Sequence, residues 1–105
     1  MYTRNVTIKL KADGAAEFTR MLEKEIIPLL RKQKGFQDEM SFVAPERNEV
    51  VAISFWDKKD NAEAYTRETY PEVLRALSKV VEGTPKVETF EVVNSTSHKI
   101  AASAV

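Results

Sequence analysis

The sequence predicts an α+β domain built on a four-stranded antiparallel sheet, and two observations carry that prediction. Four segments show the alternating or β-branched pattern of strands, namely residues 2–11, 35–43, 50–56 and 85–94. Two segments between them, residues 13–34 and 57–83, carry apolar residues at the spacing of amphipathic helices. The order along the chain is therefore strand, helix, strand, strand, helix, strand.

The first strand gives way to the first helix near residue 12. Residues 2–11 alternate between two faces, with Tyr2, Val6, Ile8 and Leu10 on one face and Thr3, Asn5, Thr7, Lys9 and Lys11 on the other. Apolar residues then recur every three or four positions, and Asp13 is the expected N-cap of this helix. Pro28 falls inside the helix, where it lacks an amide donor and clashes with the carbonyl four residues earlier. We therefore expect a kink or a break there.

The second and third strands are expected to form a hairpin. In the second strand, Phe36, Met40 and Phe42 alternate with polar residues, and residues 45–48 have the proline and asparagine of a turn. The third strand is apolar or small on both faces, with Val51, Ile53 and Phe55 on one and Val50, Ala52, Ser54 and Trp56 on the other. A strand with two such faces is central and covered on both sides.

The second helix is expected to consist of two pieces. Asp57 or Asp60 is its expected N-cap. The Thr-Tyr-Pro step at residues 69–71 divides it, because the residue before a proline disfavours helical angles and proline suits the first position of a new helix. Gly83 ends the second piece, and the fourth strand follows.

This order predicts the ferredoxin-like arrangement, in which both helices cover one face of the sheet and the first and third strands are central. Leaving Val50, Ala52 and Trp56 exposed on the other face would create an apolar patch of roughly several hundred Å². We therefore expect a homodimer formed through that sheet face. One domain is expected over residues 1–95, with a C-terminal tail over residues 96–105 that is either frayed or packed on a partner.

Composition excludes several classes of function. The 105 residues include 16 basic and 16 acidic side chains, so no overall field attracts nucleic acid or a membrane surface. The absence of cysteine excludes disulfides, thiolate metal sites and a cysteine nucleophile. The single histidine, His98, argues against a Ser-His-Asp triad and against a metal site. Because the chain has no signal peptide and no apolar run that spans a bilayer, we expect a cytoplasmic protein.

Four short features follow one another along the chain, namely the Lys34-Gly35-Phe36 step, a hairpin, an apolar strand ending at Trp56-Asp57, and a helix with Ala62 and Tyr65. In this order they resemble the antibiotic-biosynthesis-monooxygenase-like family of dimeric α/β barrels, over residues 2–94. That family includes oxygenases without cofactor that act on hydroquinones and polyketide anthrones, haem-degrading oxygenases, and domains of no known activity. The resemblance implies two subunits forming a dimeric α/β barrel. It also implies a monooxygenase without cofactor for an aromatic hydroquinone or a polyketide-like substrate.

The resemblance implies two candidate catalytic residues, Asn5 and Trp56. Family oxygenases use an asparagine to hold oxygen or substrate, and their matching tryptophan lines the cavity between helices and sheet. The candidate substrate-binding residues are Thr7, Ser54, Tyr65 and Tyr70. Such a pocket would bind the hydroquinone, stabilise its anion and exclude water, while the substrate itself supplies electrons to oxygen. The structural alternatives are a core or dimer tryptophan, a solvent-facing asparagine and tyrosines that bury a ring.

Two other functions stay open. One is a ligand-binding or regulatory dimer of the same fold without turnover. The other is a haem-binding or haem-degrading protein, but family haem-degraders carry an iron-ligating histidine on the second helix, which this chain lacks. His98 lies in the tail, where we expect a solvated loop residue.

Overall fold

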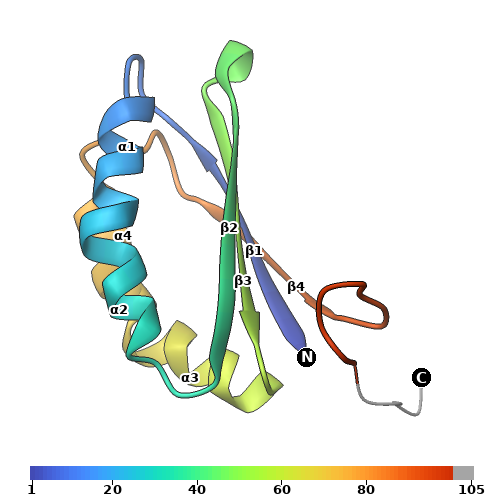
Figure 1. Ribbon diagram of the computed structural model, residues 1–105. Coiled ribbons are helices and arrows are strands. Elements are labelled where there is room, and N and C mark those ends of the chain that lie inside the picture. The colour runs from blue at the N-terminus through green and yellow to red at the C-terminus, as the bar shows by residue number, and fades with distance from the viewer. Residues whose placement is uncertain (101–105) are drawn as a thin grey trace.

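The computed structural model describes residues 1–100 and contains a four-stranded antiparallel sheet with the α-helices on one face and a 3-10 helix, Pro45–Arg47, at the tip of a hairpin (Figure 1). The strands are β1 (Tyr2–Lys9), β2 (Phe36–Ala44), β3 (Glu49–Trp56) and β4 (Lys86–Glu91). The helices are α1 (Ala15–Met21), α2 (Ile27–Arg31), α3 (Lys59–Glu68) and α4 (Tyr70–Leu77). The sheet order β2-β3-β1-β4 places β1 and β3 in the middle, which confirms the predicted ferredoxin-like arrangement.

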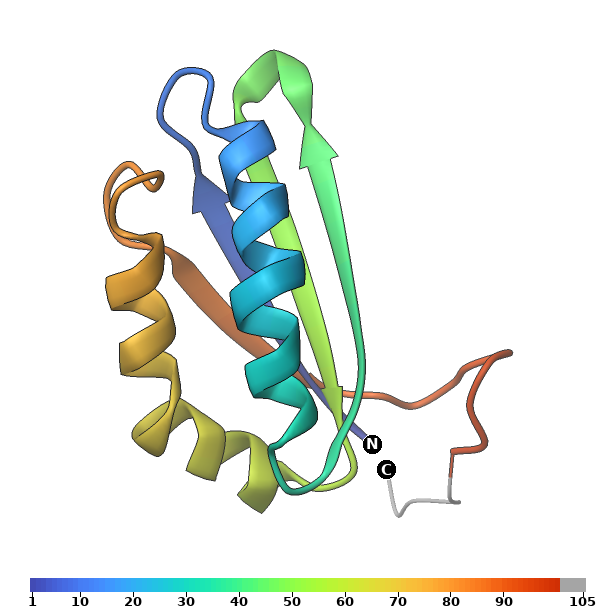
Figure 2. The same ribbon diagram turned by 60° about the vertical axis from the view of Figure 1, so that its left-hand side comes forward.

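The first helical rod changes its hydrogen-bonding pattern once. A π-helical turn, η1 (Leu22–Ile26), joins α1 to α2, and Pro28 is the second residue of α2. Figure 2 shows these segments as one continuous rod on the sheet. The wider turn accommodates a proline that cannot donate to, and would collide with, the carbonyl four residues earlier. The expected kink or break at Pro28 is therefore a π turn within an unbroken rod.

The second helical rod bends where the sequence predicts. Thr69, with φ of −120°, separates α3 from α4. The predicted N-caps are wrong, because no side-chain cap hydrogen bond begins either rod, and Gly14 and Lys58 occupy the two cap positions. Asp57 instead accepts a hydrogen bond of 2.8 Å from the Asn61 side chain.

The register of the sheet decides which side of each strand lies under the helices. Four cross-strand pairs of β1 and β3 face them, namely Tyr2 with Trp56, Arg4 with Ser54, Val6 with Ala52, and Ile8 with Val50. Val51, Ile53 and Phe55 therefore lie on the opposite side, which we call the outer face. The expectation that Val50 and Trp56 need a second subunit to cover them is wrong, because both are 0% exposed in the single chain.

A β-bulge at Gln37 changes which side of the sheet the residues of β2 point to. The register with β3 shifts between Phe36 and Asp38, so one extra residue is inserted. Phe36 consequently lies on the helix face, with its ring 5.7 Å from the Trp56 ring, whereas Met40 and Phe42 lie on the outer face. The predicted alternation, which grouped Phe36 with Met40 and Phe42, is corrected by this bulge.

Gly35 precedes the bulge and has a φ of +83°, which an L side chain rarely adopts. A Cβ atom at this position would also collide with the side chains of Asp57 and Asn61. The turn from α2 into β2 therefore requires glycine, which accounts for the Lys34-Gly35-Phe36 step in the sequence.

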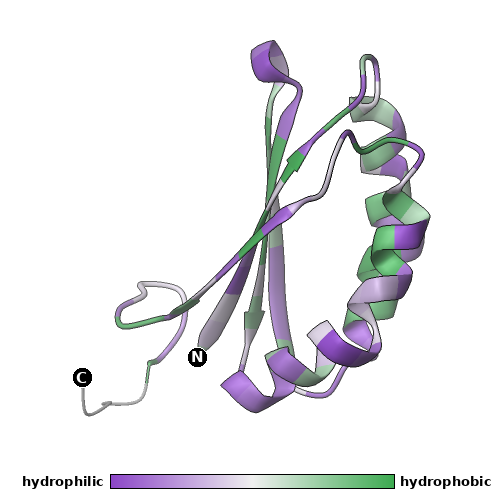
Figure 3. Ribbon diagram, turned by 180° about the vertical axis from the view of Figure 1, so that it is seen from behind, coloured by the Kyte–Doolittle hydropathy of each residue, from purple (hydrophilic) through white to green (hydrophobic). Residues whose placement is uncertain are grey.

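The outer face carries a group of apolar side chains, which we call the apolar outer patch: Met40, Phe42, Val51, Ile53, Phe55 and Phe90. Met40, Phe42 and Phe90 are each about half exposed, at 53%, 53% and 52%. Figure 3 shows hydrophobic segments along the strands as well as on the helices. Alternation on β3 leaves two apolar faces, but only one of them is covered by helices.

The chain after β4 turns back toward the outer face. The His98 ring lies 6.1 Å from the Phe55 ring, and its Nε2 pairs with the carboxylate of Asp38. His98 therefore lies in a loop, as expected, but its side chain is only 32% exposed and has a carboxylate partner. Residues 101–105, the remainder of the predicted tail, lie outside the described residues. Over residues 1–100, no helix is both long and apolar enough for a membrane span.

Candidate functional site

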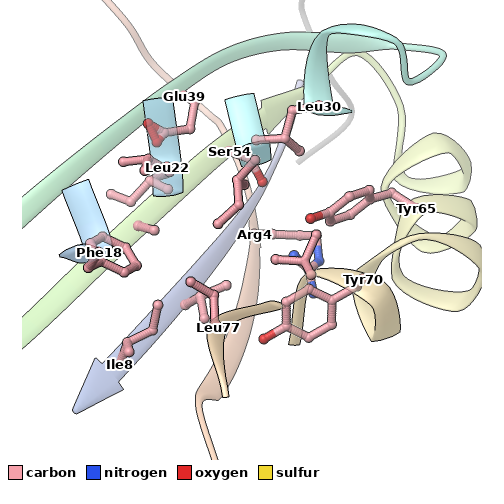
Figure 4. A pocket seen from close by; sticks show the side chains of 15 residues that line it. Arg4, Ile8, Phe18, Leu22, Leu30, Glu39, Ser54, Tyr65, Tyr70 and Leu77 are labelled. Atoms are coloured by element: carbon pink, nitrogen blue, oxygen red, sulfur yellow. The ribbon is translucent and has the colours of Figure 1, made fainter. Parts of the chain in front are cut away.

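A cavity lies between the helices and the helix face of the sheet (Figure 4). Its volume is about 50 Å³, enough for a few water molecules. Most of its wall is apolar, with Phe18, Leu22, Leu30, Val73 and Leu77 from the helices. Its polar lining consists of Arg4, Glu39, Ser54, Tyr65 and Tyr70. A mostly apolar cavity with a few converging polar groups is the usual form of a small-molecule site.

Arg4 is a charged residue in the core of this domain. It is 2% exposed and faces the helices from β1. Its guanidinium carbon lies 4.3 Å from the centre of the Tyr70 ring and 5.0 Å from that of the Tyr65 ring. A desolvated contact of this kind is worth about 2 kcal/mol. Two aromatic faces thus stabilise a cation that has lost its water.

The Arg4 cation has no negatively charged partner within residues 1–100. None of the ion pairs there includes Arg4, and its Nε and Nη2 atoms are buried without a hydrogen-bond partner. Burial lowers the pKa of Arg4, but arginine stays protonated in proteins. Because an uncompensated buried charge costs several kcal/mol, this arrangement leaves a site that favours a negative charge.

The bend between α3 and α4 brings the two tyrosines to the same site. Tyr65 lies in the last part of α3 and Tyr70 begins α4, and their ring centres are 6.1 Å apart. Burial raises the pKa of Tyr65 to about 12 and also raises the pKa of Tyr70. Both phenols are therefore neutral donors near pH 7, and the Tyr70 hydroxyl is buried without a partner.

A polar row crosses the helix face of the sheet at one level. Arg4 on β1 pairs with Ser54 on β3, and Ser54 pairs with Glu39 on β2. Neighbouring strands lie about 4.8 Å apart, so the Cα atoms of Arg4 and Glu39 are separated by about 10 Å. The row therefore has a cation at one end and a carboxyl group at the other.

The hydrogen bonds of this row leave donors and acceptors available. Trp56 Nε1 donates to Ser54 Oγ at 2.9 Å, so the Ser54 hydroxyl can donate its own proton to a ligand. The Ser41 hydroxyl donates to Glu39 Oε2 at 2.8 Å. Burial nevertheless raises the pKa of Glu39, which makes its carboxylate a stronger base than an exposed one.

The structure brings four of the predicted site residues together. Ser54, Tyr65 and Tyr70 line the cavity, and Trp56 lies next to them, with its ring centre 5.1 Å from that of Tyr65. The apolar strand that ends at Trp56, and the helix that follows it, were the features of the sequence that indicated this grouping.

Asn5 and Thr7 do not share this cavity. They lie on the outer face, where they pair with Ile53 and Val51. Successive residues of a strand point to opposite sides, so Asn5 cannot face the helices when Arg4 does. The expectation that Asn5 and Thr7 line one pocket with Trp56 and Tyr65 is therefore corrected for the single chain.

Arg4 and Glu39 are the two polar lining residues that the sequence analysis missed. Strict alternation places Arg4 in the same set as Tyr2, Val6 and Ile8, so its position was available from the period of the strand. The position of Glu39 could not be predicted in this way, because the bulge at Gln37 reverses the side to which the later residues of β2 point. Over residues 1–100, no group of three histidine, aspartate or glutamate side chains could hold a metal ion.

Comparison with known proteins gives one family and many similar folds. The family model described as antibiotic biosynthesis monooxygenase matches residues 1–71. No curated protein matches the chain. A cofactor-independent oxygenase from Streptomyces nogalater, SnoaB, is 16% identical with a TM-score of 0.75, and the match covers 92% of this chain and 97% of that one.

Two further solved structures have the same fold. A monooxygenase of Streptomyces coelicolor in complex with the ligand nanaomycin D is 18% identical with a TM-score of 0.72, covering 90% of this chain and 88% of that one. A protein of unknown function from Nitrosomonas europaea is 14% identical with a TM-score of 0.76, covering 97% and 95%. At these identities the similarity shows the fold alone.

Proposed function

The chain belongs to the antibiotic biosynthesis monooxygenase family, and on that premise we propose that it is a monooxygenase without cofactor that acts on an aromatic hydroquinone. One observation carries the proposal: a mostly apolar cavity has an unpaired cation and a basic carboxylate at opposite ends of one polar row. The similar folds of two monooxygenases support it. At about 50 Å³ the cavity is smaller than the roughly 150 Å³ of a cavity that holds benzene, so the helices must move away from the sheet to admit even a single ring.

The proposed reaction begins with loss of a phenolic proton. Glu39 accepts that proton, Ser54 donates a hydrogen bond to the substrate, and the charge of Arg4 stabilises the anion. The electron-rich anion then reduces O2. One oxygen atom bonds to a ring carbon and the other leaves as water, so the hydroquinone becomes a hydroxyquinone. The substrate supplies all the electrons that oxygen gains, and the apolar wall excludes water.

We also propose that the chain acts as a homodimer through the apolar outer patch. Half-exposed Met40, Phe42 and Phe90 are unusual on the surface of a monomer, and an identical patch on a second copy would cover them. Asn5 lies on the same face with its Oδ1 buried and unpartnered, and Thr7 is its neighbour. In this arrangement both residues face the interface between the two subunits.

Oxygen uptake by the protein in chelator-treated buffer tests the catalytic proposal. We expect uptake with hydroquinone above the rate of buffer alone. Glu39→Gln removes the base and should lower the rate by about 100-fold, since general bases contribute 10²–10⁴. Tyr65→Phe should lower it too, whereas Tyr2→Phe, the same change at a tyrosine outside the cavity, should not.

Three outcomes would contradict the proposal. Ligand binding without oxygen uptake would favour a binding or regulatory dimer. Uptake that is lost in Asn5→Ala but retained in Glu39→Gln would move the chemistry to the outer face. A Soret band on addition of haem, with uptake only in the loaded protein, would favour a haem protein.

A further inference from the structure

We infer that the cavity binds an aromatic ligand that carries a carboxylate, which Arg4 holds through two parallel hydrogen bonds. This inference rests on the proposed function, since it names the substrate class of the same site. It adds that the hydroquinone is a hydroxylated benzoate and not a neutral phenol.

The two unpartnered nitrogens of Arg4 indicate the shape of the missing group. Nε and Nη2 carry their hydrogens on the same edge of the guanidinium plane, and both are buried without a partner. A carboxylate presents two oxygens at the spacing of that edge, which gives a bidentate pair. A phenolate has one oxygen, which could accept from both parallel donors only through bent and therefore weaker hydrogen bonds.

The surroundings of Arg4 provide every contact except the anion. Tyr65 and Tyr70 lie against the guanidinium, and Figure 4 shows its nitrogens between their rings. The Tyr70 hydroxyl is a further buried donor without a partner. Glu39 is on β2, which β3 separates from the β1 strand of Arg4, so Glu39 lies at the far end of the row and does not pair with Arg4. A ligand must therefore supply the compensating negative charge.

The rest of the row orients such a ligand. With the carboxylate on Arg4, an aromatic ring extends over Ser54, and the hydroxyl meta to the carboxylate lies on the side of the ring toward Glu39. The Cα atoms of Arg4 and Glu39 are about 10 Å apart, so a ring placed between their side chains lies over Ser54. The apolar helix residues Leu22, Leu30 and Leu77 line the cavity on the side opposite the sheet.

Calorimetric binding of benzoate and of benzamide, its neutral isostere, tests the inference. Neither compound is a hydroquinone, so turnover does not affect the result. We expect benzoate to bind at least about 30-fold more tightly, because the amide keeps one acceptor oxygen but loses the second acceptor and the negative charge. Phenyl phosphate, whose anion is tetrahedral and larger, should bind more weakly than benzoate.

Variants at Arg4 assign the effect to this side chain. Arg4→Met should reduce the affinity for benzoate to that for benzamide. Arg4→Lys keeps the charge but lacks the two parallel N–H donors of the guanidinium, so it should recover only part of the affinity. Arg75→Met is the control, because it removes the same charge from an exposed position on α4. In the unaltered protein, the Arg4 Nε–H resonance should shift on addition of benzoate and not of benzamide.

Equal affinities for benzoate and benzamide, or no binding of either, would overturn the inference even if Arg4→Met fails to fold. Tighter binding of phenyl phosphate would replace carboxylate by phosphate. If the protein takes up oxygen with hydroquinone, and the uptake is no faster with 2,5-dihydroxybenzoate, the inference is refuted but the proposed function stands. If benzoate binds selectively but no oxygen uptake occurs, the proposed function is refuted and the carboxylate site stands.

Discussion

Replacing Trp56 by alanine is expected to lower the free energy of unfolding by about 3–5 kcal/mol. The side chain is 0% exposed, and the centre of its ring lies 5.7 Å from the centre of the Phe36 ring and 5.1 Å from that of the Tyr65 ring. Its Nε1 also donates to Ser54 at 2.9 Å. Removing the indole leaves a cavity beside the site and a buried hydroxyl without its donor. Since domains of this size have about 5–15 kcal/mol of stability in total, much of the fold's stability depends on this residue.

Urea unfolding followed by far-ultraviolet circular dichroism measures this effect without using the fluorescence of the only tryptophan. Trp56→Phe is the matched variant, because it keeps most of the ring and loses mainly the hydrogen bond, so we expect a loss of about 1–2 kcal/mol. A loss below about 1 kcal/mol for Trp56→Ala would show that this ring is not the packing centre of the site.

Replacing Phe42 by aspartate is expected to raise the dissociation constant of the proposed dimer by at least about 100-fold. Phe42 lies in the apolar outer patch and is 53% exposed in the single chain. A carboxylate there meets an apolar surface across a two-fold interface, and the symmetry brings in a second carboxylate. The single chain itself should keep its fold, because this side chain is already half in solvent.

Sedimentation equilibrium at micromolar concentration distinguishes the two states. The unaltered protein should have twice the mass of its 11.9 kDa chain, and Phe42→Asp should have the mass of one chain. Val43→Asp is the matched control, because Val43 is adjacent on β2, is 42% exposed and points to the opposite face. A monomeric unaltered protein, or equal dissociation by both variants, would refute a dimer through the outer face.

The order of elements could be predicted from the sequence because its signals are local. Alternation identifies β1, the turn at residues 45–48 identifies the hairpin, and the step at residues 69–71 identifies the bend between α3 and α4. Each of these signals depends on neighbours in the chain and on no tertiary contact.

For β2 and β3, unlike β1, the sequence could not show which residues point toward the helices. β3 is apolar or small on both sides, so its own sequence does not show which side the helices cover. The register with β1 decides it, and Arg4 then lies inside among apolar residues. The bulge at Gln37 is a second tertiary feature, and it places Glu39 in the cavity and Met40 outside. Sequence alone therefore identified the aromatic side of the site and missed its charged groups.

The position of a bound ring tests the central claim, which is that the cavity under the helices is the substrate site. Intermolecular nuclear Overhauser effects from hydroquinone, kept reduced under nitrogen, would locate it in a protein of this size. The account predicts contacts from the hydroquinone ring to the Tyr65 and Tyr70 rings and to the Leu77 methyl groups. Contacts to Thr7, Phe42 and Ile53 instead would place the ligand on the outer face and contradict the account.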